Sequence, residues 1–345
     1  MKTFLVTGGA GFIGSNFVHH LFHKYPEYRI LVLDLLTYAG SVDNLPTDFH
    51  DASSSGRIEF WYGDVRNASL VDNLVRRADV VVHFAAETHV TRSIFDNHHF
   101  FETDVLGTQA VANAVVKHRD RIDRFIHIST SEVYGTALAE KMDEEHPLNP
   151  MSPYASAKCG ADRLVYSYWA TYNIPAAIVR PFNNYGPYQH LEKAVPRFIT
   201  SVLLGEPLTV HGDGSAARDW LFVQDNCEAL DALLHVDVAK IRGQVINIGT
   251  ERHHNVLEVA EAILRAMGPC DSQMEFIGGR PGQVFRHTSD TSKLRQLISW
   301  EPKLSFEEGL ERTIRWYRDN EAWWRPQVWM RHIPIITAAG NREMH

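Results

Sequence analysis

The chain has 345 residues, 44% of them hydrophobic and 22% charged, which suits one large globular domain accompanied by a smaller lobe. Its formal net charge of −8 argues against nucleic acid or an acidic membrane surface as a partner. The three cysteines are widely spaced, the N-terminal apolar run is too short for a signal peptide, and no run is long enough to span a bilayer, so we expect a cytoplasmic protein.

The first half of the chain alternates short apolar runs with longer amphipathic segments. The runs are rich in Val, Ile, Leu and Phe with little alternation, as expected for a parallel sheet that is covered on both faces. The predicted strands are Thr3–Gly8, Arg29–Asp34, Ile58–Asp64, Val80–Ala86, Arg124–Thr130 and Ala176–Phe182. The amphipathic patterns predict helices at Ile13–Tyr25, Ala68–Ala78, Val105–His118 and Ala157–Tyr172. This order predicts an α/β fold with a Rossmann-type, doubly wound parallel sheet.

The rhythm changes after Phe182, where a turn-rich segment and then a further helix follow. Short strands and helices come next, including a strand at Gln244–Gly249 and a helix at Val256–Gly268. We therefore assign residues 1–182 to a dinucleotide-binding Rossmann domain, to which the strand near 244–249 returns. Residues 183–345 mainly form a smaller C-terminal α/β lobe, which we expect to bind the substrate over the carboxyl ends of the strands.

The segment TGGAGFIG joins the first predicted strand to the first predicted helix, with glycines at positions 8, 11 and 14. Bare backbone in such a turn lets a pyrophosphate approach the N–H groups at the start of the helix. Asp34 ends the second predicted strand, where a carboxylate can accept hydrogen bonds from ribose hydroxyls and repels a 2′-phosphate. We therefore predict that NAD rather than NADP is the cofactor, with Gly8, Gly11, Gly14 and Asp34 among its contacts.

A second motif couples a tyrosine and a lysine to a group of polar residues. Tyr154 and Lys158 are four residues apart, so both side chains emerge on one face of a helix. We expect the ammonium to lower the pKa of the tyrosine, so that its phenolate can take a hydroxyl proton while hydride leaves the same carbon. Thr130, Ser131 and Glu132 follow the fifth predicted strand, at an edge where parallel sheets bind ligands. Thr130 could bond the hydroxyl being oxidised, and Glu132 could remove a hydrogen that a new ketone makes acidic.

The glycine spacing, followed by Tyr-x-x-x-Lys, resembles the extended short-chain dehydrogenase/reductase superfamily. Several segments resemble its nucleotide-sugar epimerase and dehydratase branch, and most of all the dTDP-glucose 4,6-dehydratases. In that family's order they are LDLLTYAGSVDNL, AAETHVTRSI, ETDVLGTQ, STSEVYG, SPYASAKCGAD, NNYGPYQHLEK and HGDGSAARDWLFVQD, and the likeness covers nearly the whole chain. The resemblance implies further contacts with NAD from Phe12, Ile13, Asp64, Val65, Ala85 and Ala86.

The resemblance also implies a nucleotide-diphosphate sugar as the substrate, with Thr88 facing the hexose. Two phosphates suit cationic side chains held in fixed positions. The implied ligands of the nucleotide diphosphate are Asn183, Lys193, Arg218, Asn247 and Arg280. A homodimer, formed through Val105–His118 and Ala157–Tyr172, is implied as well. No spacing such as HExxH among the 19 histidines indicates a metal site.

In this family the reaction would be oxidation at C4 by NAD, loss of water across C5–C6 and return of hydride to C6. Three positions differ from the pattern of the dTDP-glucose enzymes. Ser131 replaces the usual aspartate, which protonates the departing C6 hydroxyl, Asp104 replaces a common asparagine, and Thr91 replaces an aspartate. Thr-Ser-Glu also occurs in GDP-mannose 4,6-dehydratases, so elimination is possible with Glu132 as both base and acid. It occurs equally in UDP-glucuronate decarboxylases, for which Arg286 is a candidate cation for the C5 carboxylate.

We therefore expect a nucleotide-sugar 4,6-dehydratase whose catalytic residues are Thr130, Ser131, Glu132, Tyr154 and Lys158. A decarboxylase or a 4-epimerase on the same scaffold is the alternative. All three begin with the same hydride abstraction, so the cofactor and the Tyr/Lys pair do not separate them. A catalytically silent NAD-sensing protein would have no chemical need for the intact Glu, Tyr and Lys.

Overall fold

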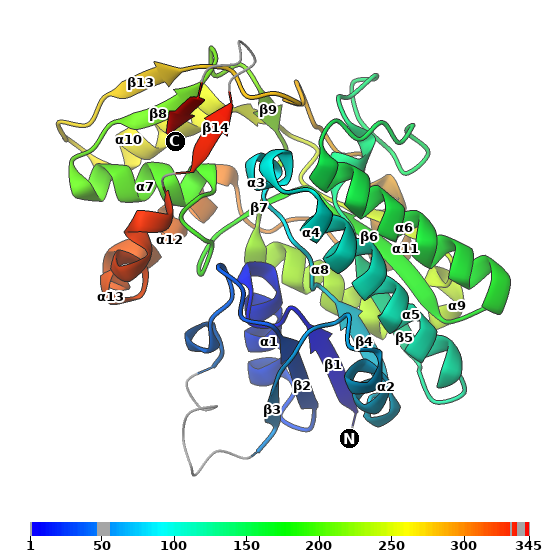
Figure 1. Ribbon diagram of the computed structural model, residues 1–345. Helices are drawn as coiled ribbons and strands as arrows, with labels where there is room; N and C mark the ends of the chain where they lie inside the picture. The colour runs from blue at the N-terminus through cyan, green and yellow to red at the C-terminus, as the bar shows by residue number, and fades with distance from the viewer. Residues whose placement is uncertain (1, 47–55, 332, 337–341, 345) are drawn as a thin grey trace.

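The centre of the fold is a seven-stranded parallel sheet with the strand order β11-β6-β5-β4-β1-β2-β3 (Figure 1). The computed structural model of the chain describes residues 2–46, 56–331, 333–336 and 342–344. The strand order reverses after β3, which confirms the predicted doubly wound, Rossmann-type sheet. The strands are β1 (Thr3–Thr7), β2 (Arg29–Asp34), β3 (Ile58–Tyr62), β4 (Val80–His83), β5 (Arg124–Ile128), β6 (Ala176–Pro181) and β11 (Val245–Ile248).

The predicted strands of this sheet are confirmed, but several end earlier than the apolar pattern predicts. The run Val80–Ala86 leaves the sheet after His83, and the run Arg124–Thr130 leaves it after Ile128. The last residues of both runs turn into loops at the carboxyl edge of the sheet, where they line a cleft. The errors in the predicted boundaries therefore fall on the residues that build the site.

Helices cover both faces of the sheet (Figure 1). One face shares an apolar core with α1, α8 and α11, and the other shares a second core with α2, α5 and α6. The bounds are α1 (Phe12–Lys24), α8 (Val223–His235), α11 (Ser292–Ile298), α2 (Ala68–Arg77), α5 (Thr108–Lys117) and α6 (Pro153–Tyr172). Because α8, α11 and β11 come from the second half of the chain, both halves build this layer. The division into domains at residue 182 stays a prediction.

Two of the predicted helices begin differently from the prediction. Helix α6 begins at Pro153, four residues early, because Ser152 caps it by accepting a hydrogen bond from the Ala155 amide at 3.1 Å and proline suits the first helical position. The helix predicted at Val105–His118 begins as a π-helix, η3 (Phe101–Gly107), which continues into α5. Short π-helical segments are frequent at functional sites, and this one lies beside α6.

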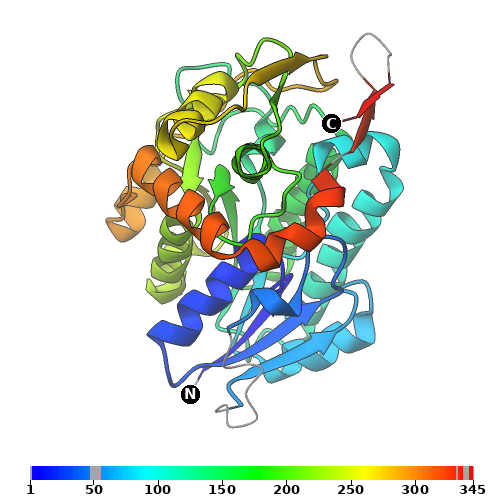
Figure 2. The same ribbon diagram turned by 90° about the vertical axis from the view of Figure 1, so that its left-hand side faces the viewer.

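A smaller lobe lies over the carboxyl ends of the strands (Figures 1 and 2). Three of its helices pack around an apolar core that contains Phe198, Ile263 and Ile314. The elements of the lobe include α7 (Ala194–Leu204), α10 (Val256–Met267), α12 (Phe306–Asp319), β8 (Leu208–His211), β13 (Met274–Ile277), β9 (Ala217–Arg218) and β12 (His254–Asn255). None of the helices in the described part of the chain is long and apolar enough to cross a membrane.

A buried carboxylate joins α1 to α8. Asp231 on α8 accepts hydrogen bonds from His20 Nε2 at 2.8 Å, Lys24 Nζ at 2.5 Å and Tyr25 Oη at 2.9 Å. Burial opposes ionisation of Asp231, but its hydrogen bonds with His20, His235, Lys24 and Tyr25 outweigh burial and hold its pKa well below the usual range. Asp231 therefore stabilises the seam between the two helices as a carboxylate.

We expect Asp231→Asn to lower the free energy of unfolding by about 3 kcal/mol, because four side chains lose a charged, buried partner. Because the folded-state pKa is depressed, the difference from wild type should be full above the unfolded pKa of about 3.9 and should shrink as the pH falls. Urea denaturation at several pH values measures both effects. Asp123→Asn is the matched control, since Asp123 is half-exposed and forms a surface ion pair with Lys2 at 3.3 Å.

Candidate active site

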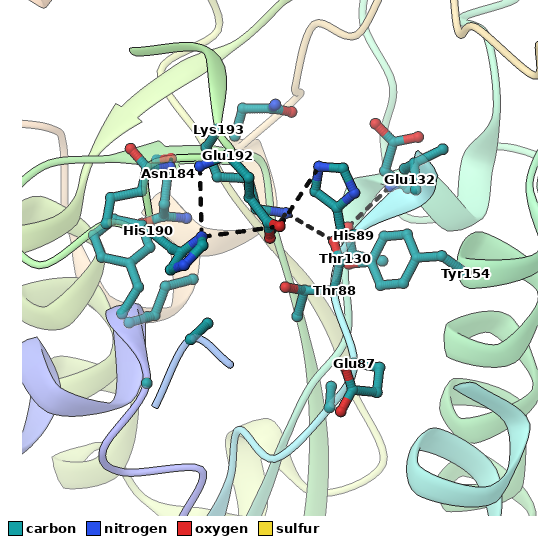
Figure 3. A pocket seen from close by; sticks show the side chains of 18 of the residues that line it. Glu87, Thr88, His89, Thr130, Glu132, Tyr154, Asn184, His190, Glu192 and Lys193 are labelled. Carbon is teal, nitrogen blue, oxygen red and sulfur yellow. Dashed lines mark hydrogen bonds and ion pairs between the residues drawn. The ribbon is translucent and has the colours of Figure 1, made fainter. Parts of the chain in front are cut away.

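A cleft of about 470 Å³ lies at the carboxyl ends of the strands, between the sheet and the smaller lobe. Its volume is ordinary for a small-molecule site. One wall is the glycine turn before α1, another is the segment after β5 with the start of α6, and the lobe supplies a third wall. Figure 3 shows side chains from the loop after β4, the segment after β5, the start of α6 and residues 184–193 around one space. The cleft therefore joins the predicted cofactor site to the predicted reactive cluster.

The glycine turn is shaped for a dinucleotide. Gly8 has a φ of +68°, and a Cβ atom there would lie 2.6 Å from the Ala85 nitrogen. A Cβ atom at Gly14 would lie 2.2 Å from the Gly8 carbonyl oxygen. At Gly11 the closest atom would be 3.4 Å away, so that position is bare on the side of the cleft. The Asp34 carboxylate is fixed by the Ala10 and Leu36 amides at 2.9 and 2.8 Å, and these residues together fit the pyrophosphate and ribose of NAD.

The structure brings nearly all of the predicted cofactor residues to the cleft. The lining residues among them are Gly8, Gly11, Phe12, Ile13, Gly14, Asp34, Val65, Ala85, Ala86, Tyr154 and Lys158. Asp64 is the exception. Its carboxylate accepts two hydrogen bonds from the Arg66 guanidinium, at 2.6 and 2.9 Å, and Arg66 also pairs with Glu102 at 2.7 Å. Asp64 is therefore committed to an ion pair next to the lining residue Val65.

We expect Gly11→Ala to keep the fold but to weaken NAD binding at least about tenfold, equivalent to about 1.4 kcal/mol. The added methyl meets only an ordinary contact inside the protein, yet it occupies the surface that the pyrophosphate approaches. Calorimetric titration with NAD measures the affinity, and thermal unfolding without NAD measures the fold. Gly279→Ala is the control, since no atom lies within 4 Å of a Cβ there. Unchanged affinity in Gly11→Ala would remove this turn as the pyrophosphate site.

Tyr154 and Lys158 lie in the first turns of α6 and both line the cleft. Lys158 Nζ donates a hydrogen bond to the Ile128 carbonyl at 2.7 Å. Burial raises the pKa of Tyr154 well above the usual range, although a hydrogen bond with Thr130 works in the opposite direction. The sequence-based expectation of a lowered pKa therefore fails for the protein alone. Burial dominates because the ammonium is held by a carbonyl and shares the interior with a carboxyl group.

That carboxyl group belongs to Asp104, on the π-helix η3. Asp104 is 1% exposed, and its Oδ1 accepts a hydrogen bond from the Glu87 amide at 2.8 Å. Burial raises the pKa of Asp104 to about 7, with Lys158 opposing the rise. Asp104 thus ties the loop after β4 to η3 and places a titratable group near the lysine. Thr91, the other substituted position, is buried on α3 (Val90–Phe95) and also lines the cleft.

Glu132 faces the cleft from a short 3₁₀ turn (Ser131–Tyr134) that Thr130 caps by accepting a hydrogen bond from the Glu132 amide at 3.2 Å. Glu132 Oε1 lies 3.4 Å from Arg218 Nε. Burial alone would raise the pKa of Glu132, but the positive charge around it, that of Arg218 foremost, outweighs burial and holds the pKa below its usual value. Glu132 is therefore a carboxylate at neutral pH, the form that a base requires.

Ser131 makes a contact that the sequence did not indicate. Its Oγ lies 3.3 Å from Nδ1 of His287, whose Nε2 lies 2.8 Å from the Gly135 carbonyl oxygen. His287 is fully buried, and its Nδ1 is also 4.0 Å from Glu132 Oε1. Burial lowers the pKa of His287 to about 4. Ser131, the serine that replaces the usual aspartate, is therefore in contact with a neutral imidazole.

A second polar cluster lies across the cleft, around Glu192 (Figure 3). The Glu192 side chain is fully buried and accepts hydrogen bonds from Tyr38 Oη at 2.8 Å and Arg92 Nε at 3.0 Å. Burial opposes its ionisation, but neighbouring His89, Lys193, His190 and Arg92 lower the pKa of Glu192 to about 2. Sequence reasoning missed this carboxylate. It neutralises the cations on its wall and thereby fixes their positions.

The structure places most of the predicted substrate residues in the cleft. The lining residues among them are Thr88, Asn183, Lys193, Arg218 and Arg280. Lys193 Nζ donates a hydrogen bond to the Thr88 carbonyl at 2.9 Å, so two of them are in contact. Arg218 Nη1 donates to the Ala217 and Val284 carbonyls at 2.9 Å each, which orients its guanidinium toward Glu132.

Two predicted substrate residues, Asn247 and Arg286, lie outside the cleft lining. Asn247 is fully buried, accepts a hydrogen bond from Tyr134 Oη at 2.7 Å and donates one to the Met142 carbonyl at 3.0 Å. The Arg286 guanidinium donates hydrogen bonds to the Ala139 and Glu140 carbonyls and to the Thr288 hydroxyl. Both side chains bond to loops instead of facing the cleft, because tertiary packing turns them away from it.

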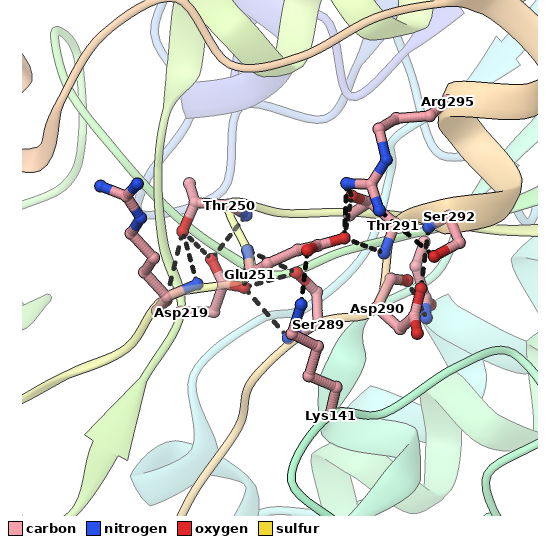
Figure 4. A network of polar contacts seen from close by, with 11 residues as sticks. Lys141, Asp219, Thr250, Glu251, Ser289, Asp290, Thr291, Ser292 and Arg295 are labelled. Carbon is pink, nitrogen blue, oxygen red and sulfur yellow. Dashed lines mark hydrogen bonds and ion pairs between the residues drawn. The ribbon is translucent and has the colours of Figure 1, made fainter.

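A buried network fixes the backbone next to Arg218 (Figure 4). Asp219 is fully buried and accepts hydrogen bonds from the amides of Thr250, Glu251 and Ser289 at 2.9 to 3.0 Å. The hydroxyls of Thr250 and Ser289 donate to the same carboxylate at 2.6 and 2.5 Å. The strand that carries Arg218 is therefore clamped to the loop after β11 and to the segment before α11.

Comparisons with known proteins agree with this site. The family model for GDP-mannose 4,6-dehydratase matches residues 5–313. The low-salt glycan biosynthesis protein Agl12 of Haloferax volcanii is 47% identical over 318 residues, which cover 92% of this chain and 99% of that protein. A dTDP-glucose 4,6-dehydratase of Mycobacterium tuberculosis is 43% identical over 326 residues, covering 93% and 95%. A solved dTDP-glucose 4,6-dehydratase from Streptomyces venezuelae with NAD bound has a TM-score of 0.87 and 39% identity, covering 94% and 99%.

Proposed function

Because the chain belongs to the GDP-mannose 4,6-dehydratase family, we propose that it is an NAD-dependent nucleotide-sugar 4,6-dehydratase, a lyase that acts on a nucleotide-diphosphate hexose. Held by the glycine turn and Asp34, NAD would supply the hydride acceptor for C4 of the hexose and later the hydride for C6. Tyr154 takes the proton of the C4 hydroxyl, and Thr130, its hydrogen-bonding neighbour, holds the same oxygen. Lys158, on the same face of α6 and in the same cleft, is proposed to add positive charge that opposes the effect of burial on the phenol.

The observation that supports the proposal is the ionised carboxylate of Glu132 in the cleft. Once C4 is a ketone, the hydrogen on C5 is acidic, and an ionised carboxylate in the same cleft as Tyr154 can remove it. A 4-epimerase only transfers hydride to and from C4 and needs no such base. A decarboxylase needs a cation for the C5 carboxylate, and the Arg286 guanidinium bonds loop carbonyls instead. Elimination of water is therefore the outcome that this geometry supports best.

The nucleotide diphosphate is proposed to lie against the cations of the smaller lobe. Lys193, Arg218 and Arg280 line that part of the cleft, and Asn183 offers an amide beside them. Burial lowers the pKa of Arg280 to about 10, which leaves its guanidinium charged at neutral pH. Because several relatives at 40 to 43% identity act on dTDP-glucose, dTDP-hexoses are the first substrates to test.

One incubation tests the function. The enzyme is mixed with dTDP-, GDP- and UDP-hexoses and with UDP-glucuronate, and the products are weighed by mass spectrometry. We expect one nucleotide hexose to lose the mass of one water without consuming added NAD. Loss of CO₂ from UDP-glucuronate would replace the proposal with a decarboxylase, and an unchanged mass with a new sugar would replace it with an epimerase.

We also propose a cytoplasmic homodimer that pairs η3–α5 and α6 of each subunit. The outer surface of these helices carries large exposed apolar side chains, namely Phe101, Leu106, Tyr166 and Tyr172. Exposed apolar side chains of this size on neighbouring helices are typical of a surface that another subunit covers. Cys159, Cys227 and Cys270 are free, which suits a reducing compartment. Sedimentation should give twice the chain mass for wild type, and Leu106→Glu should shift it toward the monomer.

A further inference from the structure

We propose that His287 is a positioning residue for dehydration: it holds the Ser131 hydroxyl as an acceptor for the substrate's C6 hydroxyl, and Glu132 alone moves the proton. This inference rests on the proposed dehydratase function. It explains how elimination proceeds where serine replaces the usual aspartic acid. The observation that supports it is a contact of 3.3 Å between Ser131 Oγ and His287 Nδ1. Both side chains are buried, and the two residues lie far apart in the sequence.

The hydrogen bonds of His287 decide which nitrogen carries the proton. Nε2 lies 2.8 Å from the Gly135 carbonyl, which can only accept, so the Nε2 hydrogen points there. A neutral ring has only one N–H, so Nδ1 is an acceptor and the Ser131 hydroxyl donates to it. Ser131 is 1% exposed and His287 is fully buried, so water does not compete for this bond. Ser131 lines the cleft, and we take a remaining lone pair of its Oγ to accept from the C6 hydroxyl of a substrate bound there.

The surroundings keep the ring neutral. Burial is the main cause of the lowered pKa of His287, and the positive charge of Arg218 adds to it. Among the described residues, Glu132 is the only carboxylate within 4.0 Å of the ring nitrogens, and its Oε1 also lies 3.4 Å from Arg218 Nε. A neutral ring carries no proton on Nδ1, so it could not return a proton to Ser131 after Ser131 had acted as an acid. Proton transfer to the leaving oxygen therefore falls to Glu132.

The step balances with one carboxylate. Glu132 takes the C5 hydrogen as a proton and becomes a carboxylic acid, while the C–H electron pair moves onto the C4 carbonyl oxygen. As that pair returns to form the C5–C6 double bond, the C6–O bond breaks. The oxygen leaves with the proton from Glu132 as water, and Glu132 is again a carboxylate. Ser131 and His287 end with the protons they began with, and their task is to hold the C6 oxygen beside Glu132.

The test separates positioning from a structural role. His287→Phe keeps the ring shape but removes the acceptor, so dehydration should slow by up to about 100-fold, the cost of a small misplacement. Oxidation at C4 should be unaffected, so reduced nicotinamide should accumulate in a single turnover and be seen by its absorbance. His287→Asn should recover part of the rate, because its Oδ1 can accept from Ser131. Ser131→Ala should match His287→Phe, and the double variant should be no slower than either single variant.

His146→Phe is the matched control. His146 is a buried histidine of the same region; its ring bonds to the Leu138 amide and the Pro147 carbonyl, packs edge-on against Tyr134 and does not line the cleft. It should keep the wild-type ratio of oxidation to dehydration.

A readout free of turnover is the ¹⁵N resonance of His287, which should show a single proton, on Nε2, at neutral pH.

Four results would overturn the proposal, and three of them are normal dehydration in His287→Phe, equal slowing of both steps, and a doubly protonated or Nδ1-protonated ring in wild type. Multiplied losses in the double variant would do the same, since independent effects add in free energy. If wild type yields no dehydrated sugar at all, the proposed function fails, whereas the ¹⁵N resonance still reports on the Ser131–His287 contact.

Discussion

Glu132→Gln is expected to lower dehydration by about 1,000-fold, within the usual range for loss of a general base, while NAD binding and oxidation at C4 persist. The amide cannot accept the C5 proton, yet it has nearly the shape of the carboxylate and can still contact Arg218. Mixing the variant with substrate should therefore produce reduced nicotinamide that does not decay. Stopped-flow absorbance measures that accumulation, and mass spectrometry measures the absence of a dehydrated product.

The pH dependence of this base follows from its charge. Positive charge around Glu132, that of Arg218 foremost, holds its pKa below the usual value, so the reactive carboxylate is present throughout the neutral range and is lost only as the pH falls through that lowered pKa. Glu145→Gln, an exposed change on the neighbouring loop, is the control and should keep full turnover. Full turnover in Glu132→Gln would remove Glu132 as the base and the dehydratase argument with it.

Much of the fold was predictable because its determinants are local. A strand that is buried on both faces has to be a continuous apolar run, and each run of that kind in the first half pairs in the sheet. The strand ends were less predictable, because residues 84–86 and 129–130 are apolar or small whether they pair or turn away. The early start of α6 depends on the cap made by Ser152, a local signal that the pattern of apolar residues does not contain.

The same holds for the site: local motifs were predictable from the sequence, and contacts between distant segments were not. Motifs within one turn, such as Gly8 to Gly14 and Tyr154 with Lys158, have their geometry fixed by the backbone and reach the cleft as predicted. Asn247 lies on β11, where side chains alternate between the two faces of the strand, and its hydrogen bond with Tyr134 fixes the face on which it lies. His287 could not be found from sequence, because its contact with Ser131 exists only after the smaller lobe docks on the sheet.

Tyr154→Phe is the second substitution with a large expected effect, about 1,000-fold or more, but at the first step. Without the phenol oxygen no group takes the C4 hydroxyl proton, since Lys158 is held by the Ile128 carbonyl and Thr130 is not a base. Reduced nicotinamide should therefore fail to form even in a single turnover, whereas it accumulates in Glu132→Gln. NAD affinity, measured by calorimetry, should stay within about threefold of wild type, since the ring itself remains in place.

The two variants together decide the order of steps, because one should stop before oxidation and the other after it. Tyr166→Phe is the control for Tyr154→Phe: it lies on the same helix, it is 40% exposed, and it is away from the cleft. Burial raises the pKa of Tyr154, so wild-type oxidation should accelerate as the pH rises toward that value, and Tyr154→Phe should lose this dependence. Reduced nicotinamide forming at the wild-type rate in Tyr154→Phe would mean that another group takes the proton, and Asp104, whose pKa burial raises to about 7, would be the first residue to test.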